Sequence, residues 1–198
     1  MAEKLLLLRH AETGPRFRGR FLGSTDVAAS REGLERLGRL QPLLEHYSPA
    51  SWYCSPSTRA KQTEKTLRRI FSANHDTCFD SLLQEIDFGD WEKQTFKEVA
   101  RTQPHAVEEW LRRPLDFCFP GGESLGDFAG RMETVLHRLL SDPAEHILVI
   151  THGGVIRVII CLLLGLSPAD YLLFEVEAGR MTLLDIFGTR GVLSGLNL

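Results

Sequence analysis

Two short apolar runs place the strongest limit on how this chain can fold. LLLL occupies residues 5–8 and ILVI occupies residues 147–150, and neither run alternates apolar with polar side chains. A strand with one face in water alternates, whereas a strand of a parallel sheet covered on both faces is continuously apolar. The two runs therefore predict buried strands of a mostly parallel sheet with helices on both sides.

Signals for helices and shorter strands lie between and around these runs. Ser30 can cap a helix whose leucines recur at helical spacing to Leu44, and Ser55 before Pro56 is typical of the start of a helix that reaches about Phe71. The other expected elements are helices at 95–101, at 104–112 and from FPGGES to about residue 140, and strands at 51–54, 77–79, 173–176 and 180–187. Strands that alternate with helices predict an α/β fold, a three-layer α/β/α sandwich with a mostly parallel central sheet, as a single domain over 1–198.

Composition argues against several classes of function. A net charge of −3 gives no general attraction to nucleic acid or to an anionic membrane. The apolar segment 147–166 carries His152 and Arg157, which are costly inside a bilayer, so we expect a strand, a glycine turn and a buried helix there. Arg9 interrupts the N-terminal apolar run, which argues against a signal peptide. The four cysteines are far apart, which predicts free thiols in a cytoplasmic protein.

Both of the long apolar runs lead into a histidine. His10 follows Arg9 directly after the first run, and His152 precedes two glycines after the second. Ligands of open parallel sheets bind outside the carboxyl ends of the strands. A lone histidine at a strand end usually has a structural role, but two at equivalent positions indicate one shared site.

Arg59 and Glu85 add to this site. Arg59 falls in the first turn of a predicted helix, where a cation is unfavourable unless an anion binds at the helix terminus. Glu85 lies in LLQEIDFGDWE, which could be a solvated acidic loop, although a carboxyl group beside apolar side chains also suits proton donation. Two histidines, two arginines and a carboxylate, without metal-ligand spacing, favour phosphoryl transfer through a histidine nucleophile.

Arginines are also concentrated in one predicted loop. Arg16, Arg18 and Arg20 follow Arg9 within a dozen residues. This segment is either a solvated basic loop or an anion-binding rim of the site, and the sequence leaves both interpretations open.

The motifs resemble a known family when they are taken together. Arg9-His10-x-Glu12-Thr13 is similar to the opening signature of the histidine phosphatase superfamily, which includes the cofactor-dependent phosphoglycerate mutases. The segments SPSTRAKQT, LLQEIDFGDWE, PGGES and VITHGGVIR resemble its further motifs, in family order, between about residues 5 and 166.

The resemblance implies a phosphoglycerate mutase-like fold and a role for each matched residue. His10 would be the nucleophile that becomes phosphohistidine, and Glu85 would donate a proton and then activate water. Arg9, Arg59 and His152 would hold the phosphoryl oxygens. The substrate would be contacted by Arg16, Arg20, Ser24, Thr25 and Gly153. No metal and no cofactor would be required.

The chain departs from the family pattern at three positions. Ala11 replaces the usual glycine after the histidine, Arg16 stands where many members have asparagine, and Lys93 replaces the glycine common after Trp-Glu. We expect these changes to tune substrate choice and to leave the chemistry intact.

The third motif favours a phosphatase over a mutase. The mutases are longer and carry Arg-His-Tyr-Gly where this chain reads EIDFGDW. The motifs are most similar to those of the α-ribazole phosphatases, which remove a 5′-phosphate during assembly of the lower loop of cobalamin. The partner would then be a small phosphorylated metabolite, with no role for nucleic acid or membrane. A broad-specificity sugar or nucleotide phosphatase, a mutase and a non-catalytic phospho-ligand binding module are the alternatives, and oligomeric state is not predicted.

Overall fold

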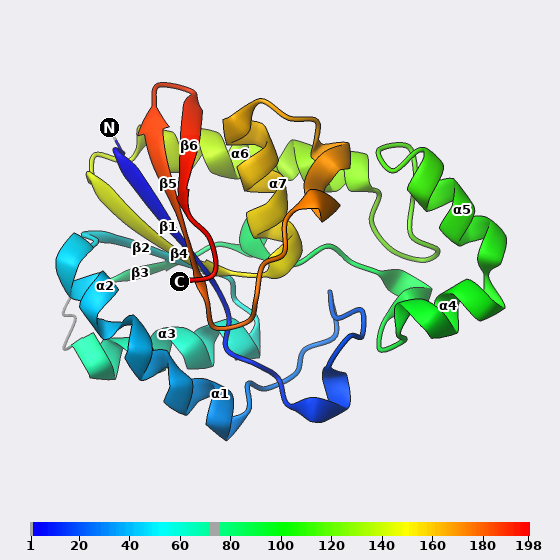
Figure 1. Cartoon of the computed structure of the whole chain (residues 1–198), viewed down its shortest axis with the longest axis horizontal. Helices are drawn as coiled ribbons and strands as arrows, with labels where there is room; N and C mark the ends of the chain where they lie inside the picture. Colours follow the sequence, from blue (N-terminus) through cyan, green and yellow to red (C-terminus); the bar gives the residue numbers. More distant parts are fainter. Residues whose placement is uncertain (1, 72–75) are drawn as a thin grey trace.

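A six-stranded sheet forms the centre of the computed structural model, which describes residues 2–71 and 76–198 (Figure 1). The strands are β1 (Lys4–Arg9), β2 (Ser51–Cys54), β3 (Thr77–Phe79), β4 (His146–Thr151), β5 (Met181–Phe187) and β6 (Arg190–Gly195). Their order is β3-β2-β4-β1-β5-β6. β1, β2, β3 and β4 pair in parallel, whereas β5 pairs antiparallel with both β1 and β6. The prediction of a mostly parallel sheet is confirmed.

Helices cover both faces of this sheet, which gives the predicted three layers (Figure 1). The helices are α1 (Arg31–Glu35), α2 (Gln41–Tyr47), α3 (Thr58–Phe71), α4 (Phe96–Thr102), α5 (Pro104–Arg112), α6 (Leu125–Ser141) and α7 (Gly153–Leu164). Short 3-10 helices span Pro15–Phe17, Arg36–Leu40, Ser81–Leu83, Gly89–Trp91 and Pro168–Leu173. α1, α2 and α3 lie on one face, and α6 and α7 lie on the other.

The continuous apolar run of β1 follows from these two layers. Leu5 and Leu7 pack into the apolar cluster that includes residues of α6 and α7, such as Met132. Leu6 and Leu8 point to the opposite face and pack into the cluster formed with α2 and α3. All four leucines are fully buried, and each burial contributes about 1.5–3 kcal/mol.

α4 and α5 form a helical hairpin at one end of the molecule, beside the sheet layers (Figure 1). A capping box of Thr95 and Glu98 starts α4. An aromatic cluster joins the hairpin to the core, with the Trp91 ring 5.6 Å from that of Trp110 and 5.2 Å from that of Phe119. These contacts fix the hairpin beside the end of the sheet where the strands β1 and β4 finish.

Three predicted elements differ in the structure. The helix expected from Ser30 to Leu44 is interrupted, because a 3-10 helix over Arg36–Leu40 separates α1 from α2. Ser55 is not the cap of α3, which begins at Thr58, where Asp26 accepts the backbone N–H at 2.8 Å. The strand expected at 173–176 is also wrong, because residues 168–173 form a 3-10 helix and the segment after them joins no strand of the sheet. The sheet gains β6 instead, for which the sequence analysis predicted no strand.

The apolar segment 147–166 contains most of β4 and all of α7, as a strand followed by a buried helix. No helix within the described residues is long and apolar enough to cross a membrane. The four cysteines are free thiols, two of them buried.

Candidate active site

The parallel pairing of β1 and β4 brings two histidines together. Arg9 is in register with Thr151, so the chain leaves both strands at the same edge. The backbone N–H of His10 donates to the Thr151 carbonyl at 2.8 Å, and the ring centroids of His10 and His152 lie 5.1 Å apart. Both side chains are buried, with 6% and 1% of their surface exposed.

His10 has one unprotonated ring nitrogen. Its Nδ1 lies 2.8 Å from the Ala11 carbonyl, which can only accept, so Nδ1 carries the proton and Nε2 keeps a lone pair. Burial, together with the positive charges of Arg9 and Arg59, holds the pKa of His10 well below its ordinary value of 6.5. The imidazole is therefore neutral near pH 7 and can act as a nucleophile through Nε2.

Arg59 lies directly against this nitrogen. Its Nε donates to His10 Nε2 at 3.3 Å, while its other nitrogens donate to the carbonyls of Leu22, Gly23 and Thr25 at 2.9–3.2 Å. Burial lowers the pKa of Arg59, and the charge of Glu85 opposes that decrease. The carbonyls fix a guanidinium beside the imidazole, inside the protein.

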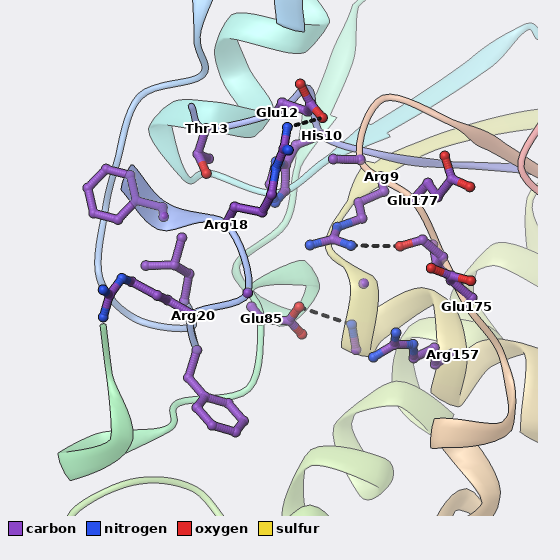
Figure 2. Close-up of a pocket in the computed structure, with 18 of the residues that line it drawn as sticks. Arg9, His10, Glu12, Thr13, Arg18, Arg20, Glu85, Arg157, Glu175 and Glu177 are labelled. Carbon is purple, nitrogen blue, oxygen red and sulfur yellow. Dashed lines mark hydrogen bonds and ion pairs between the residues drawn. The ribbon is translucent and has the colours of Figure 1, made fainter. Parts of the chain in front are cut away.

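Arg9 supplies a second guanidinium from the last residue of β1. Its Nη1 donates to the Val176 carbonyl at 2.6 Å, and its Nε is buried without a partner (Figure 2). Burial lowers the pKa of Arg9, and the charge of Glu85 opposes this as well. An unpartnered buried N–H is costly, which makes Nε a candidate donor to a bound anion.

His152 is held by the loop after β2. Ser55 Oγ lies 2.8 Å from His152 Nε2, and Ser57 Oγ lies 3.4 Å from it. The opposite nitrogen, Nδ1, is buried and has no partner. Burial, followed by the effects of His10 and the two arginines, lowers the pKa of His152 well below 6.5.

The Gly-Gly pair at the start of α7 leaves space for Glu85. The Gly154 N–H donates to Glu85 Oε2 at 3.0 Å (Figure 2), and the Ile86 N–H donates to Oε1 at 3.2 Å. A Cβ at Gly154 would lie 2.4 Å from Glu85 Oε1, closer than any side chain tolerates. The positive end of the α7 dipole also faces this side of the site.

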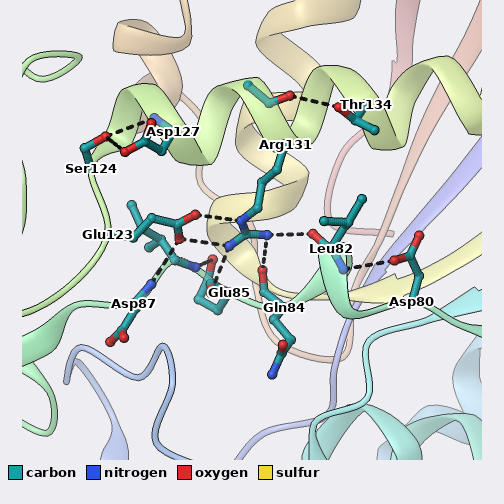
Figure 3. A network of polar contacts seen from close by, with 12 residues as sticks. Asp80, Leu82, Gln84, Glu85, Asp87, Glu123, Ser124, Asp127, Arg131 and Thr134 are labelled. Atoms are coloured by element: carbon teal, nitrogen blue, oxygen red, sulfur yellow. Dashed lines mark hydrogen bonds and ion pairs between the residues drawn. The ribbon is translucent and has the colours of Figure 1, made fainter.

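Arg131 of α6 organises the segment that carries Glu85 (Figure 3). Its Nε and Nη2 donate to the two carboxylate oxygens of Glu123 at 2.7 and 3.0 Å. Its remaining bonds, at 2.6–3.1 Å, go to the carbonyls of Leu82, Gln84 and Glu85. One guanidinium thus fixes the backbone on both sides of the Glu85 side chain.

These residues border a cavity of about 840 Å³ (Figure 2). Arg9, His10, Glu85, Gly153 and Gly154 form its inner end, with Arg59 and His152 buried directly behind His10. One wall is aromatic and consists of Phe21, Phe88, Trp110 and Tyr171. The charged residues around it include Arg18, Arg36, Arg157, Glu175 and Glu177.

Of the five residues expected to contact the substrate, two line the cavity and three do not. Gly153 and Arg20 line the cavity, whereas Arg16, Ser24 and Thr25 do not. The Arg20 guanidinium is bound to the Lys93 carbonyl at 2.7 Å and to Glu98 at 3.0 Å.

The backbone of 23–25 is occupied by another contact. The N–H groups of Gly23, Ser24 and Thr25 donate to the Glu92 carboxylate at 2.8–3.2 Å. This loop therefore supports Arg59 through its carbonyls and is tied to Glu92 through its N–H groups.

Two of the three arginines of the basic loop have a carboxylate near them. Arg20 pairs with Glu98, and Arg18 lies 3.8 Å from Glu12, which also accepts from Arg36 at 2.9 Å. Arg16 is exposed, with its guanidinium 5.7 Å from the Phe17 ring.

Several residues that line the cavity were not among the predicted site residues. Arg157 could have been found, because it lies four residues after Gly153 on one helix and therefore on the same face. Its Nε donates to the Phe174 carbonyl at 2.8 Å. Glu175 and Glu177 belong to a segment without any motif, so no sequence signal marked them.

The segment 174–178, which we call the strap, passes along the cavity wall. Asn197 holds it from outside: its side-chain amide donates to the Glu175 carbonyl at 2.9 Å and accepts the Glu177 N–H at 2.8 Å. Between these two bonds lies Val176, whose carbonyl binds Arg9. The strap therefore connects the end of the chain with the inner end of the cavity.

Within the described ranges, no group of three or more His, Cys, Asp or Glu side chains is arranged to hold a metal ion. The inner end combines the His10 imidazole, the Glu85 carboxylate and the buried Arg9 guanidinium, a set that is chemically suited to nucleophilic attack, proton transfer and anion binding.

Comparison with known proteins gives a consistent result. A family model described as "Histidine phosphatase superfamily (branch 1)" matches residues 5–198. The adenosylcobalamin/alpha-ribazole phosphatase of Salmonella typhimurium (strain LT2) is 28% identical over 198 residues, covering 98% of this chain and 96% of that protein. Phosphoserine phosphatase 1 of Hydrogenobacter thermophilus (strain TK-6) is 27% identical over 197 residues, covering 98% and 92%. The crystal structure of the alpha-ribazole phosphatase from Shigella flexneri is similar with a TM-score of 0.83 and 25% identity, covering 98% of this chain and 96% of that chain.

Proposed function

Because this chain belongs to branch 1 of the histidine phosphatase superfamily and is a phosphoric monoester hydrolase, we propose that it acts through a phosphohistidine at His10 and that its substrate is α-ribazole 5′-phosphate. The observation that carries the mechanism is the neutral imidazole of His10, whose Nε2 lone pair is held against Arg59 at the inner end of the cavity.

In the first step, His10 Nε2 attacks phosphorus while the bond from phosphorus to the ester oxygen breaks. Arg9 and Arg59 balance the negative charge of the transferring group, and the unpartnered Arg9 Nε and His152 Nδ1 donate to its oxygens. Arg9 Nε and His152 Nδ1 are without partners before the substrate binds, whereas the Arg59 Nε–H must move from His10 Nε2 to a phosphoryl oxygen as Nε2 attacks.

Glu85 handles the protons in both steps. It gives a proton to the departing ester oxygen, so that the product leaves as an alcohol. It then takes a proton from the water that attacks the phosphohistidine, which releases inorganic phosphate and restores His10. The Gly154 N–H holds one carboxylate oxygen in place through both steps.

The size and the wall of the cavity support the choice of substrate. At about 840 Å³, the cavity is large for a phosphate ester of a small alcohol such as serine. α-Ribazole 5′-phosphate adds a ribose and a flat, uncharged bicyclic ring, which suits the aromatic wall that includes Phe88 and Tyr171. The similarity to two α-ribazole phosphatases supports the same choice.

The test is phosphate release from a panel of esters with and without a chelator. The panel contains α-ribazole 5′-phosphate, phosphoserine, 3-phosphoglycerate, sugar phosphates and nucleotides. We expect the highest kcat/KM for α-ribazole 5′-phosphate, no effect of the chelator and near-total loss in His10→Ala, since uncatalysed monoester hydrolysis can be slower by a factor of up to about 10²¹. Activity that persists in His10→Ala would overturn the mechanism, and a preference for phosphoserine would overturn the substrate.

The role of Glu85 has a separate test. Glu85→Gln should lose most activity on alkyl esters, whose leaving oxygen needs a proton, and much less on p-nitrophenyl phosphate, whose leaving group departs as an anion. Equal losses on both esters would contradict proton donation by Glu85.

A further inference from the structure

A second hollow lies directly beside the catalytic cavity. It has a volume of about 350 Å³, and almost all of the atoms that line it are apolar. Phe96 of α4 and Leu111 of α5 line only this hollow, which we call the apolar groove. The other five residues that line it, including Phe21, Trp110 and Leu172, also line the catalytic cavity.

This shared wall indicates what occupies the groove. Because the two hollows share Phe21 and Trp110, a ligand that extends from His10 past these side chains would reach the groove. We propose that the apolar groove is a subsite for the uncharged ring, or another apolar end, of the leaving group, at the far side of the ligand from its phosphate. This inference rests on the proposed phosphatase function and specifies which class of ester that function selects.

Large apolar side chains are left in water around the groove. Phe96 is 48% exposed, Leu111 is 59% exposed and Leu172 is 49% exposed. Single exposed leucines are common, but several gathered around one hollow that is continuous with a binding cavity form a binding surface. Covering them removes apolar surface from water, which stabilises the complex with an apolar ligand.

The groove is also fixed in shape before any ligand binds. Arg20, at its border, is bonded to the Lys93 carbonyl and to Glu98, which joins the segment between β1 and α1 to the start of α4. Trp110 is only 5% exposed, with its ring centroid 5.6 Å from that of Trp91 and 6.2 Å from that of Phe21. A preformed subsite loses little conformational entropy on binding.

The lining disfavours a charged occupant, because Arg20 is the one charged residue among the described residues that form it, and that guanidinium is already bonded to Glu98 and to the Lys93 carbonyl. The groove offers almost no polar atoms to a phosphate, a carboxylate or an ammonium group, and burial without partners would be costly for each of them. The ring of α-ribazole fits this description, whereas a serine leaving group has no apolar end to place there.

The experiment compares two esters that differ only in the apolar group. α-Ribazole 5′-phosphate carries the ring, and ribose 5-phosphate does not. The ratio of their kcat/KM values is measured for the wild type, for Leu111→Ser and for Leu173→Ser. Leu173 is the matched control, because it is 73% exposed, adjoins Leu172 and lines neither hollow.

We expect the wild type to prefer the ring-bearing ester. Leu111→Ser should reduce the ratio by about tenfold, the scale at which apolar pockets discriminate small differences in apolar contact, and Leu173→Ser should leave it unchanged. An unchanged ratio in Leu111→Ser, or an equal fall in both variants, would overturn the subsite.

Three further outcomes separate the subsite proposal from the phosphatase function on which it rests. If Leu111→Ser alters the oligomeric state in sedimentation and keeps the ratio, the groove binds a second copy of the chain and the proposal is wrong. If the wild type hydrolyses neither ester, the substrate proposal fails and the subsite fails with it. If it hydrolyses both at one ratio in all three proteins, only the subsite fails.

Discussion

At the scale of single residues, the site depends on two histidines that are kept uncharged. His10 and His152 are almost wholly buried, and their main positive neighbours are Arg9 and Arg59. Burial and these charges both disfavour the imidazolium form, so the pKa of each ring is lowered well below 6.5 in the folded protein. The burial and the charges that keep these imidazoles neutral also destabilise the folded protein in acid.

Stability should therefore fall as the pH is lowered from 7.5 to 5. In this window the unfolded chain binds protons at these two histidines and the folded chain does not. The free energy of unfolding therefore decreases progressively as the pH falls below about 6.5. Each histidine contributes a slope of at most about 1.4 kcal/mol per pH unit. Urea unfolding at a series of pH values measures this slope.

The control is His105, which has 97% of its side chain exposed. His105→Ala should keep the wild-type slope, whereas His10→Gln and His152→Gln should each reduce it. A double His10→Gln/His152→Gln variant with the wild-type slope would show that other groups control the acid sensitivity.

Lys93 shows what a sequence can indicate at this scale and what it cannot. The sequence marked it as a departure from a glycine, and the structure gives the reason for the glycine, because Lys93 has a φ of 64°, in the left-handed region. Its carbonyl binds Arg20, a contact that no sequence pattern announced. We predicted the identity of the unusual position, but its effect depends on a contact between distant segments.

At the scale of elements, α6 controls the segment that carries Glu85. Arg131 makes five hydrogen bonds from one planar guanidinium. Two go to the Glu123 carboxylate, and three go to the backbone carbonyls of Leu82, Gln84 and Glu85. The backbone of this segment has no sheet or long helix to define it, so the side chain of a neighbouring helix does so.

Arg131→Lys should lower kcat by about 10- to 100-fold with a smaller change in KM, because an ammonium group cannot span the same acceptors and Glu85 is displaced from its working position. The loss should be greater for alkyl esters than for p-nitrophenyl phosphate, as for Glu85→Gln. Steady-state kinetics on the two esters provides the measurement.

Arg138→Lys is the matched control, since Arg138 lies on the same helix and pairs with Asp80. It should leave the leaving-group dependence at the wild-type value. An Arg131→Lys enzyme that loses thermal stability but keeps the wild-type dependence would indicate a structural role alone.

Elements with strong local patterns were predicted well, and those defined by distant contacts were not. The strand at 51–54 and the helix at 104–112 have the predicted bounds, because their burial pattern and the proline at the helix start are local properties. Ser55 before Pro56 carries the same local signal as a helix cap, yet its hydroxyl binds His152, which is 97 positions away. The strand β6 was not predicted, because Arg190–Gly195 mixes small, polar and apolar residues at an exposed edge of the sheet and has no continuous apolar run.

At the scale of the whole molecule, the site is assembled from nearly the full length of the chain. His10 follows the first strand, Glu85 lies before α4, His152 follows β4, and the strap is held by Asn197. Sequence reasoning found the members with family motifs, but the strap follows from the position of β5 beside β1, which no local pattern encodes.

Asn197→Ala should raise KM for phosphate esters by about tenfold, or 1.4 kcal/mol, because both bonds that hold the strap are lost and the Val176 carbonyl no longer fixes Arg9. Inhibition by inorganic phosphate should weaken by the same factor. Ser194→Ala, on the neighbouring strand β6, should change neither value. A fall in thermal stability with unchanged phosphate inhibition would contradict the link to Arg9.

The position of Trp110 makes its fluorescence a probe of ligand binding in the cavity and the groove. The chain has three tryptophans, and of these only Trp110 borders the cavity and the groove. A ligand in either hollow changes the polarity around this indole, so its fluorescence should shift on binding even when no bond is broken. In a Trp52→Phe/Trp91→Phe background, the fluorescence emission of Trp110 in a His10→Ala protein would measure the affinity for intact esters. Binding would then be measured separately from turnover.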